Sequence, residues 1–127
     1  MLINFTNHPS EKWTEDQKNS AIELYGEVKE LPFPAVPTSA GASEVSVMAD
    51  GIIDKILAMR EENPGAEDFA VMVQGEFTLT YAVVRRLLAR GIKTVSAVSE
   101  RIVTEQVESG VVRKTAVFRF AGFREYT

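Results

Sequence analysis

Short apolar runs alternate along this chain with longer segments whose apolar residues recur every three or four positions, and this alternation restricts the possible fold most strongly. An apolar run bounded by turn residues is typical of a buried strand, and the longer period is typical of an amphipathic helix. Because strands that alternate with helices form parallel sheets through right-handed crossovers, we expect an α/β fold. The predicted strands are 2–5, 27–31, 69–73 and 92–98, and the predicted helices are 10–25, 45–60 and 78–90.

The C-terminal part of the chain has a different pattern. Residues 102–107 and 111–120 alternate around Glu108-Ser109-Gly110, which predicts a β-hairpin that adds edge strands or builds a dimer contact. The expected architecture is therefore a Rossmann-like three-layer sandwich, with a mainly parallel sheet and a C-terminal antiparallel hairpin. A chain of 127 residues has room for one such core, so we expect a single domain over residues 1–127.

Composition excludes several classes of function. The chain has no cysteine and only one histidine, His8, which excludes cysteine-based and multi-histidine metal sites, and we expect neither a metal nor a cofactor. A net charge of −4 argues against binding to duplex DNA, which requires a basic face. The N-terminus lacks the pattern of a signal peptide, and no apolar run approaches the roughly 20 residues of a membrane span. We therefore expect a cytoplasmic protein that does not contact membranes.

Polar residues follow three of the predicted parallel strands. In an open α/β sheet, ligands bind beyond the carboxyl ends of the strands, so these residues predict a ligand site along one rim of the sheet. The candidates are Thr6, Asn7, His8 and Ser10 after the first strand, Gln74, Gly75, Glu76 and Thr78 after the third, and Ser99 and Arg101 in a loop after the fourth.

Each candidate has a functional and a structural interpretation. The imidazole of His8 can exchange a proton at neutral pH or contact a phosphate, or it can only hydrogen-bond the turn. Arg101 can bind a phosphate through its planar guanidinium, or form an exposed ion pair with Glu100. Gly75 permits close approach of the backbone, before a helix start whose N–H groups can hold a phosphate. Ser10 and Thr78 can instead serve only as helix N-caps.

The aromatic residues have the same two interpretations. Trp13 can stack on a base, but we expect it to pack within the first helix. We expect Phe118, Phe120 and Phe123 to form core or a dimer interface and not a platform for a nucleotide.

The Asn-His-Pro-Ser that follows the first strand, the Gly-Glu-x-Thr at a strand–helix junction and the closing hairpin resemble the small stand-alone CRISPR-associated proteins with a CARF-like fold. The likeness extends over nearly the whole chain and is sharpest over 2–34 and 71–101. The Gly-Gly-Thr-Lys-like run of CARF domains is absent, and Gly75-Glu76 stands in its place. The resemblance implies that cyclic oligoadenylate binds across the two-fold axis of a homodimer. It also implies that the chain acts as a metal-independent ring nuclease in type III CRISPR signalling, as some small members do.

Three functions therefore stand as hypotheses. The first is a CARF-like homodimer that binds cyclic oligoadenylate and cleaves it, with His8 as the acid or base and Arg101 as the group that stabilises charge. Such cleavage uses the ligand's own 2′-hydroxyl, so the protein has only to orient the ligand and stabilise charge. The second is a noncatalytic module that binds a nucleotide or another small ligand and regulates a partner. The third is a structural homodimer without a ligand.

Overall fold

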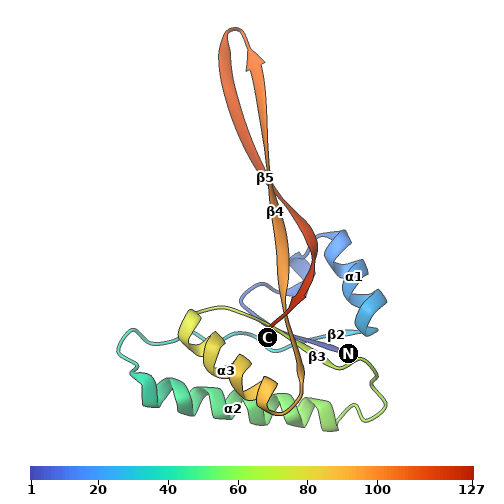
Figure 1. Cartoon of the computed structure of the whole chain (residues 1–127), viewed down its shortest axis with the longest axis vertical. Coiled ribbons are helices and arrows are strands. Elements are labelled where there is room, and N and C mark those ends of the chain that lie inside the picture. Colours follow the sequence, from blue (N-terminus) through green and yellow to red (C-terminus); the bar gives the residue numbers. More distant parts are fainter.

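The computed structural model describes the whole chain, residues 1–127. Strands and helices alternate as far as the fourth strand, and a long hairpin ends the chain (Figure 1). In chain order the elements are β1 (Leu2–Thr6), the 3-10 helix η1 (Ser10–Lys12), α1 (Glu15–Tyr25), β2 (Val28–Glu30), α2 (Ala42–Glu61), β3 (Ala70–Gln74), α3 (Phe77–Ala89), β4 (Lys93–Glu108) and β5 (Val111–Glu125).

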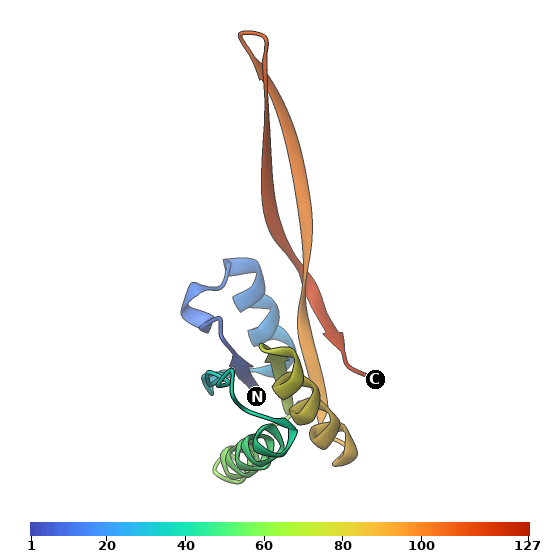
Figure 2. The same cartoon turned by 90° about the vertical axis from the view of Figure 1, so that its left-hand side faces the viewer.

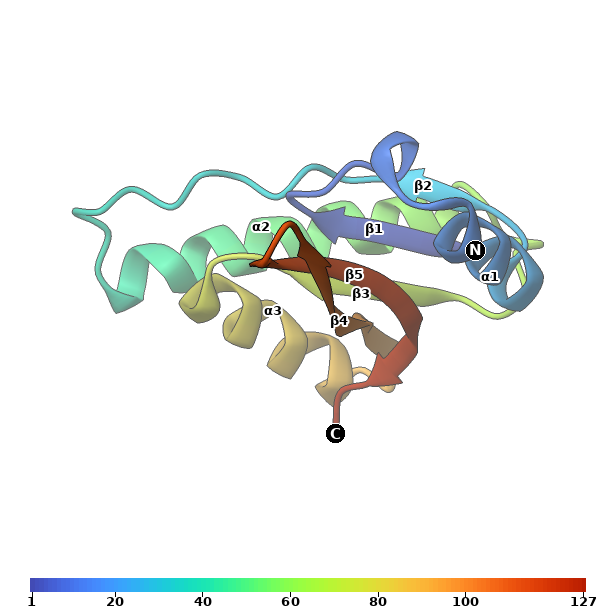
Figure 3. The same cartoon turned by 90° about the horizontal axis from the view of Figure 1, so that it is seen from above.

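The strands form one 5-stranded sheet in the order β2-β1-β3-β4-β5. The first four are parallel to their neighbours, and β5 runs antiparallel to β4. Helix α1 covers one face, while α2 and α3 lie together against the other (Figure 3). The predicted fold class is confirmed: the chain is a Rossmann-like three-layer sandwich with a C-terminal antiparallel hairpin.

Two hydrophobic cores lie on the two faces of the sheet. Ile3 and Phe5 of β1 pack with the apolar stripes of α2 and α3, whereas Leu2 packs with Trp13 and α1 on the other face. The alternation follows from the pleat, because successive side chains of a strand point to opposite faces. None of the helices is both long and apolar enough to cross a bilayer.

The prediction of a loop at Ser99, Glu100 and Arg101 is wrong. These residues lie within β4, a single strand of 16 residues that replaces the predicted strands 92–98 and 102–107. They pair with Phe120, Arg119 and Phe118 of β5. Beyond the sheet the two strands continue as a ribbon that stands away from the body of the molecule (Figures 1 and 2). Both faces of this ribbon meet solvent, so polar residues occur inside the strand. We call residues 99–120 the arm.

Two predicted helix starts are also wrong. Ser10 opens the 3-10 helix and not α1, which begins after Thr14, whose Oγ1 accepts a hydrogen bond from the Gln17 N–H at 3.4 Å. Helix α3 is capped by Glu76 and not by Thr78. The Glu76 carboxylate accepts hydrogen bonds from the N–H groups of Thr78 and Leu79, at 2.9 and 2.8 Å. The start of α3 was predicted at Thr78 because short polar residues are preferred as N-caps. The longer side chain of Glu76 reaches both N–H groups and caps the helix instead.

Candidate functional site

A cleft of about 300 Å³ opens on the α1 face of the sheet, at the carboxyl ends of β1 and β3 and beside β4; we call it the strand-end cleft. Five of the candidates predicted from sequence line it together: Thr6, Asn7, His8, Gln74 and Ser99. A hollow of about 280 Å³ adjoins it, shares Thr6 and Asn7, and extends toward Glu30 and Phe33. The strand ends therefore form one continuous concave surface.

The loop that carries His8 is held from below by a buried asparagine. Asn4, only 2% exposed, donates from Nδ2 to the His8 carbonyl at 3.0 Å and to Glu30 Oε1 at 3.2 Å. Its Oδ1 accepts a hydrogen bond from the Thr6 hydroxyl at 2.8 Å. Glu30 Oε1 also accepts from the Ser10 N–H at 2.6 Å, which explains why Ser10 is fixed although it lies outside the cleft. This asparagine was not among the predicted candidates, because it lies within an apolar run that looked like core.

His8 has its structural role in its backbone and not in its ring. Its carbonyl also accepts a hydrogen bond from Trp13 Nε1 at 3.1 Å, and its N–H donates to Thr6 Oγ1 at 3.1 Å. The residue itself is exposed at the edge of the cleft. Because the backbone groups hold the loop, the imidazole is available to a ligand.

Gln74 joins two strands where the sheet begins to open. The register between β3 and β4 ends at Met72 and Val95, and the Gln74 amide bridges the next gap. Its Oε1 accepts from the Ala97 N–H at 3.0 Å, and its Nε2 lies 3.5 Å from the Ala97 carbonyl. Gln74 therefore positions β4 as the arm departs, and its side chain also forms part of the cleft wall.

The lining of the cleft has one lysine, one histidine and several aromatic rings. Lys12 and His8 line it, and no aspartate or glutamate does, although the chain has 18 acidic residues. Trp13, Phe118 and Phe120 contribute aromatic surface. Trp13 packs in the core as expected, but between η1 and α1 and not within a helix. The antiparallel register brings Phe118 and Phe120 to the cleft, and their expected place in core or a dimer interface, and not in a ligand platform, stays a prediction.

The remaining candidates lie outside the strand-end cleft. Arg101 is exposed on the arm. It lies opposite Phe118 of β5 and follows Ser99 along β4, farther from the body of the molecule. Gly75 is required by packing: a Cβ at this position would lie 2.5 Å from ring atoms of Phe33, which stacks on Phe5 with the centroids 4.7 Å apart. Glu76 serves as the cap of α3.

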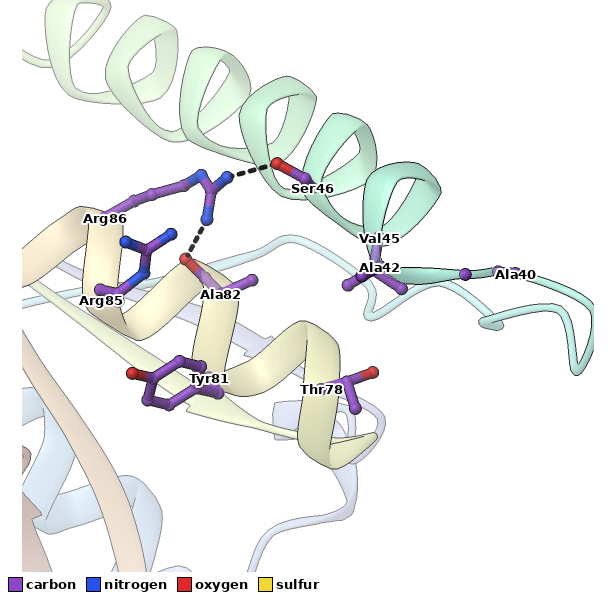
Figure 4. Close-up of a pocket in the computed structure, with 10 residues that line it drawn as sticks. Ala40, Ala42, Val45, Ser46, Thr78, Tyr81, Ala82, Arg85 and Arg86 are labelled. Atoms are coloured by element: carbon purple, nitrogen blue, oxygen red, sulfur yellow. Dashed lines mark hydrogen bonds between the residues drawn. The ribbon is translucent and has the colours of Figure 1, made fainter.

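Thr78 lines a different cavity of about 440 Å³, formed where α2 and α3 begin (Figure 4). Arg86 bridges the two helices there: its guanidinium donates to Ser46 Oγ at 2.8 Å, to the Ala82 carbonyl at 3.0 Å and to Asp50 at 2.8 Å. These bonds occupy the arginine and pair its charge. Arg86 is therefore a structural cross-link between the two helices, while the exposed Arg85 also lines this cavity.

The capping role of Glu76 predicts a pH dependence of stability. Hydrogen bonds from the N–H groups of Leu79 and Thr78, and from the Thr78 hydroxyl, lower the pKa of Glu76 from its ordinary value of 4.5. A pKa that is lower in the folded state stabilises the fold above the unfolded pKa, and this contribution is lost as pH falls through the folded pKa. We expect Glu76→Gln to unfold at a lower urea concentration than wild type at neutral pH, with the difference shrinking below about pH 4.

The matched control for this measurement is Asp54→Asn, an exposed change in the middle of α2. This variant is expected to follow the wild-type urea midpoint at both pH values. An equal loss in both variants, or a Glu76→Gln deficit that does not change with pH, contradicts the capping role.

Fold and site together define a class: a small Rossmann-like α/β domain with a projecting β-ribbon and, at its strand ends, a cleft lined by a lysine, a histidine and aromatic rings. Within this class, the chain belongs to the uncharacterized protein MJ1673 family, whose model matches residues 1–124. No curated protein and no solved structure matches the chain. Function is therefore argued from the cleft.

Proposed function

We propose that this protein is a CARF-like homodimer of the cytoplasm that binds cyclic oligoadenylate in the strand-end cleft and cleaves it. One observation carries the proposal: in a chain of net charge −4, this cleft has a lysine, a histidine, no carboxylate and three aromatic rings in its lining. Cations favour a phosphate, and aromatic faces favour a stacked base. A nucleotide presents both groups together.

The size of the cleft supports a ligand shared between two copies. Sites for small molecules occupy roughly 300–1,000 Å³, and this cleft lies at the lower limit. It has room for about one nucleotide, so a ring of several adenylates extends beyond the cleft and requires further surface. A two-fold dimer supplies that surface to each cleft from the other copy.

The proposed reaction uses the ligand's own hydroxyl. The 2′-oxygen attacks the adjacent phosphorus, the bond from phosphorus to the 5′-oxygen breaks, and the products carry a 2′,3′-cyclic phosphate and a 5′-hydroxyl. The His8 imidazole accepts the proton of the 2′-hydroxyl, and Lys12 offsets the charge that develops on the phosphate. A water molecule protonates the leaving 5′-oxygen, and the hydroxide so formed takes the proton back from His8. We assign this second role to Lys12, which lines the cleft, in place of Arg101, which lies outside it.

A noncatalytic binding module is the second candidate, and one observation favours it. The lining holds one imidazole and no carboxylate, so no second acid–base side chain of this kind is positioned to protonate the leaving 5′-oxygen. In this candidate the same cleft holds the nucleotide and presents it to a partner.

Incubation with cyclic tetra-adenylate and cyclic hexa-adenylate, in the presence of a chelator, tests both candidates. Trp13 is the only tryptophan and lines the cleft, so its fluorescence reports binding while chromatography reports cleavage. We expect a saturable fluorescence change and linear products ending in a cyclic phosphate. A fluorescence change with the ring left intact supports the noncatalytic module. No change with either ring overturns the proposal.

A further inference from the structure

The arm exposes apolar side chains along most of its length. Beyond Ser99, β4 pairs only with β5, and the ribbon projects from the body (Figures 1 and 2). On it, Val107 is 71% exposed and Phe118 68%. A two-stranded ribbon alone is marginally stable in water, and a contiguous exposed apolar surface marks an interaction site. The arm therefore has a surface that a partner covers.

One face of the arm is continuous with the strand-end cleft, and we call it the inner face. Side chains that lie directly opposite in an antiparallel pair share a face, and every second residue returns to it. The row formed by Ser99 and Phe120 lines the cleft. The next rows toward the tip are Arg101 with Phe118, Val103 with Ala116, Glu105 with Lys114, and Val107 with Val112. Apolar side chains thus recur from the tip of the arm to the cleft wall, interrupted by the exposed Glu105–Lys114 ion pair, whose Nζ and Oε1 lie 3.5 Å apart.

The arm is nearly neutral in charge. It has four basic side chains and three acidic ones, while the whole chain has 14 basic and 18 acidic residues. Because like net charges repel, two copies of this acidic chain approach most easily through their nearly neutral arms. The inner face is also self-complementary, because Arg101 and Glu105 lie on either side of Val103 along the same strand.

We infer that the inner faces of two arms pack against each other, antiparallel, about a two-fold axis that passes near Val103. In this arrangement Val103 meets the partner's Val103, and Arg101 meets the partner's Glu105. Val107 and Val112 at each tip then cover the partner's Ser99 and Phe120. The partner's tip thereby forms a roof over the strand-end cleft. This last consequence rests on the proposed function, whereas the pairing of the arms does not.

Because the chain has no cysteine, a single introduced thiol tests the pairing directly. Packed sheets lie about 10 Å apart, beyond the roughly 7 Å reach of a disulfide, so the reagent is a short bismaleimide. We expect Val103→Cys to form a cross-linked dimer at micromolar concentration, at least tenfold more than the matched control Thr104→Cys, whose thiol lies on the opposite face. Equal cross-linking of the two variants, or none with Val103→Cys while its thiol still reacts with a monofunctional maleimide, overturns the inference.

A second pair of variants tests the pairing of the arms without a cross-linker. In light scattering coupled to size-exclusion chromatography, Val103→Lys is expected to have the mass of a monomer, and Thr104→Lys that of a dimer. A monomeric wild type at every concentration tested overturns the pairing. Neither experiment contains a nucleotide, so a dimer that pairs through its arms but binds no cyclic oligoadenylate refutes the proposed function and leaves the pairing in place.

Discussion

His8→Ala is expected to slow the cleavage of a bound cyclic oligoadenylate by about 10²–10⁴-fold, the usual contribution of a positioned acid or base. The loss falls on the chemical step, because the fold uses the carbonyl and N–H of His8, and alanine keeps both. Urea unfolding of the variant should match that of wild type. Single-turnover measurements with excess protein separate the chemical step from binding, and the change in Trp13 fluorescence reports the affinity.

The matched control is Asn7→Ala, the neighbouring exposed residue in the lining of the same cleft. Its amide has no proton to exchange at neutral pH, so we expect its effect on affinity to exceed its effect on the rate of the bound complex. Cleavage by His8→Ala at the wild-type rate would remove the catalytic role of the imidazole. Binding in the absence of cleavage in wild type would leave the noncatalytic module as the function of the cleft.

The order of elements was predictable because it depends on local patterns. Apolar runs such as residues 69–73 and the period of residues 45–60 correspond to β3 and α2, and the parallel sheet follows from their alternation. The unbroken strand through Ser99, Glu100 and Arg101 was not predictable in this way. Its stability comes from hydrogen bonds to β5, some twenty residues away in sequence, and not from burial of either face.

The candidate site was predictable in part for a topological reason. Parallel strands end at a common edge, so the residues just after β1 and β3 come together whatever their identity. The rule fails four residues after the end of β3, where the chain has turned: Thr78 lies in α3 on the opposite face of the sheet. It also misses Lys12, which reaches the cleft from a 3-10 helix, and Phe118, which reaches it only through the register of the arm.

The buried amide of Asn4 is expected to be the largest polar contribution to stability near the cleft. In Asn4→Leu the side chain keeps a similar volume, so the cavity term is small and the loss is polar. Three hydrogen bonds are lost, to the Thr6 hydroxyl, the His8 carbonyl and the Glu30 carboxylate. Each of these groups keeps another partner, because the Thr6 hydroxyl and Trp13 Nε1 still donate to the His8 carbonyl and the Ser10 N–H still donates to Glu30. Since a hydrogen bond contributes about 0.5–1.5 kcal/mol, we expect the free energy of unfolding to fall by about 2–4 kcal/mol. Urea titration followed by circular dichroism measures this loss.

Asn63→Leu is the control, because Asn63 Nδ2 makes one comparable bond, to the Met59 carbonyl at 2.9 Å, at the end of α2 and far from the strand ends. Its cost should stay near 1 kcal/mol, the net value of a typical hydrogen bond. A second readout separates local from global effects. Because Trp13 Nε1 and Asn4 Nδ2 share the His8 carbonyl, the tryptophan emission of folded Asn4→Leu should shift, while that of Asn63→Leu should not. Equal stability losses in the two variants with unchanged emission would show that the His8 loop is held by its neighbours and not by this amide.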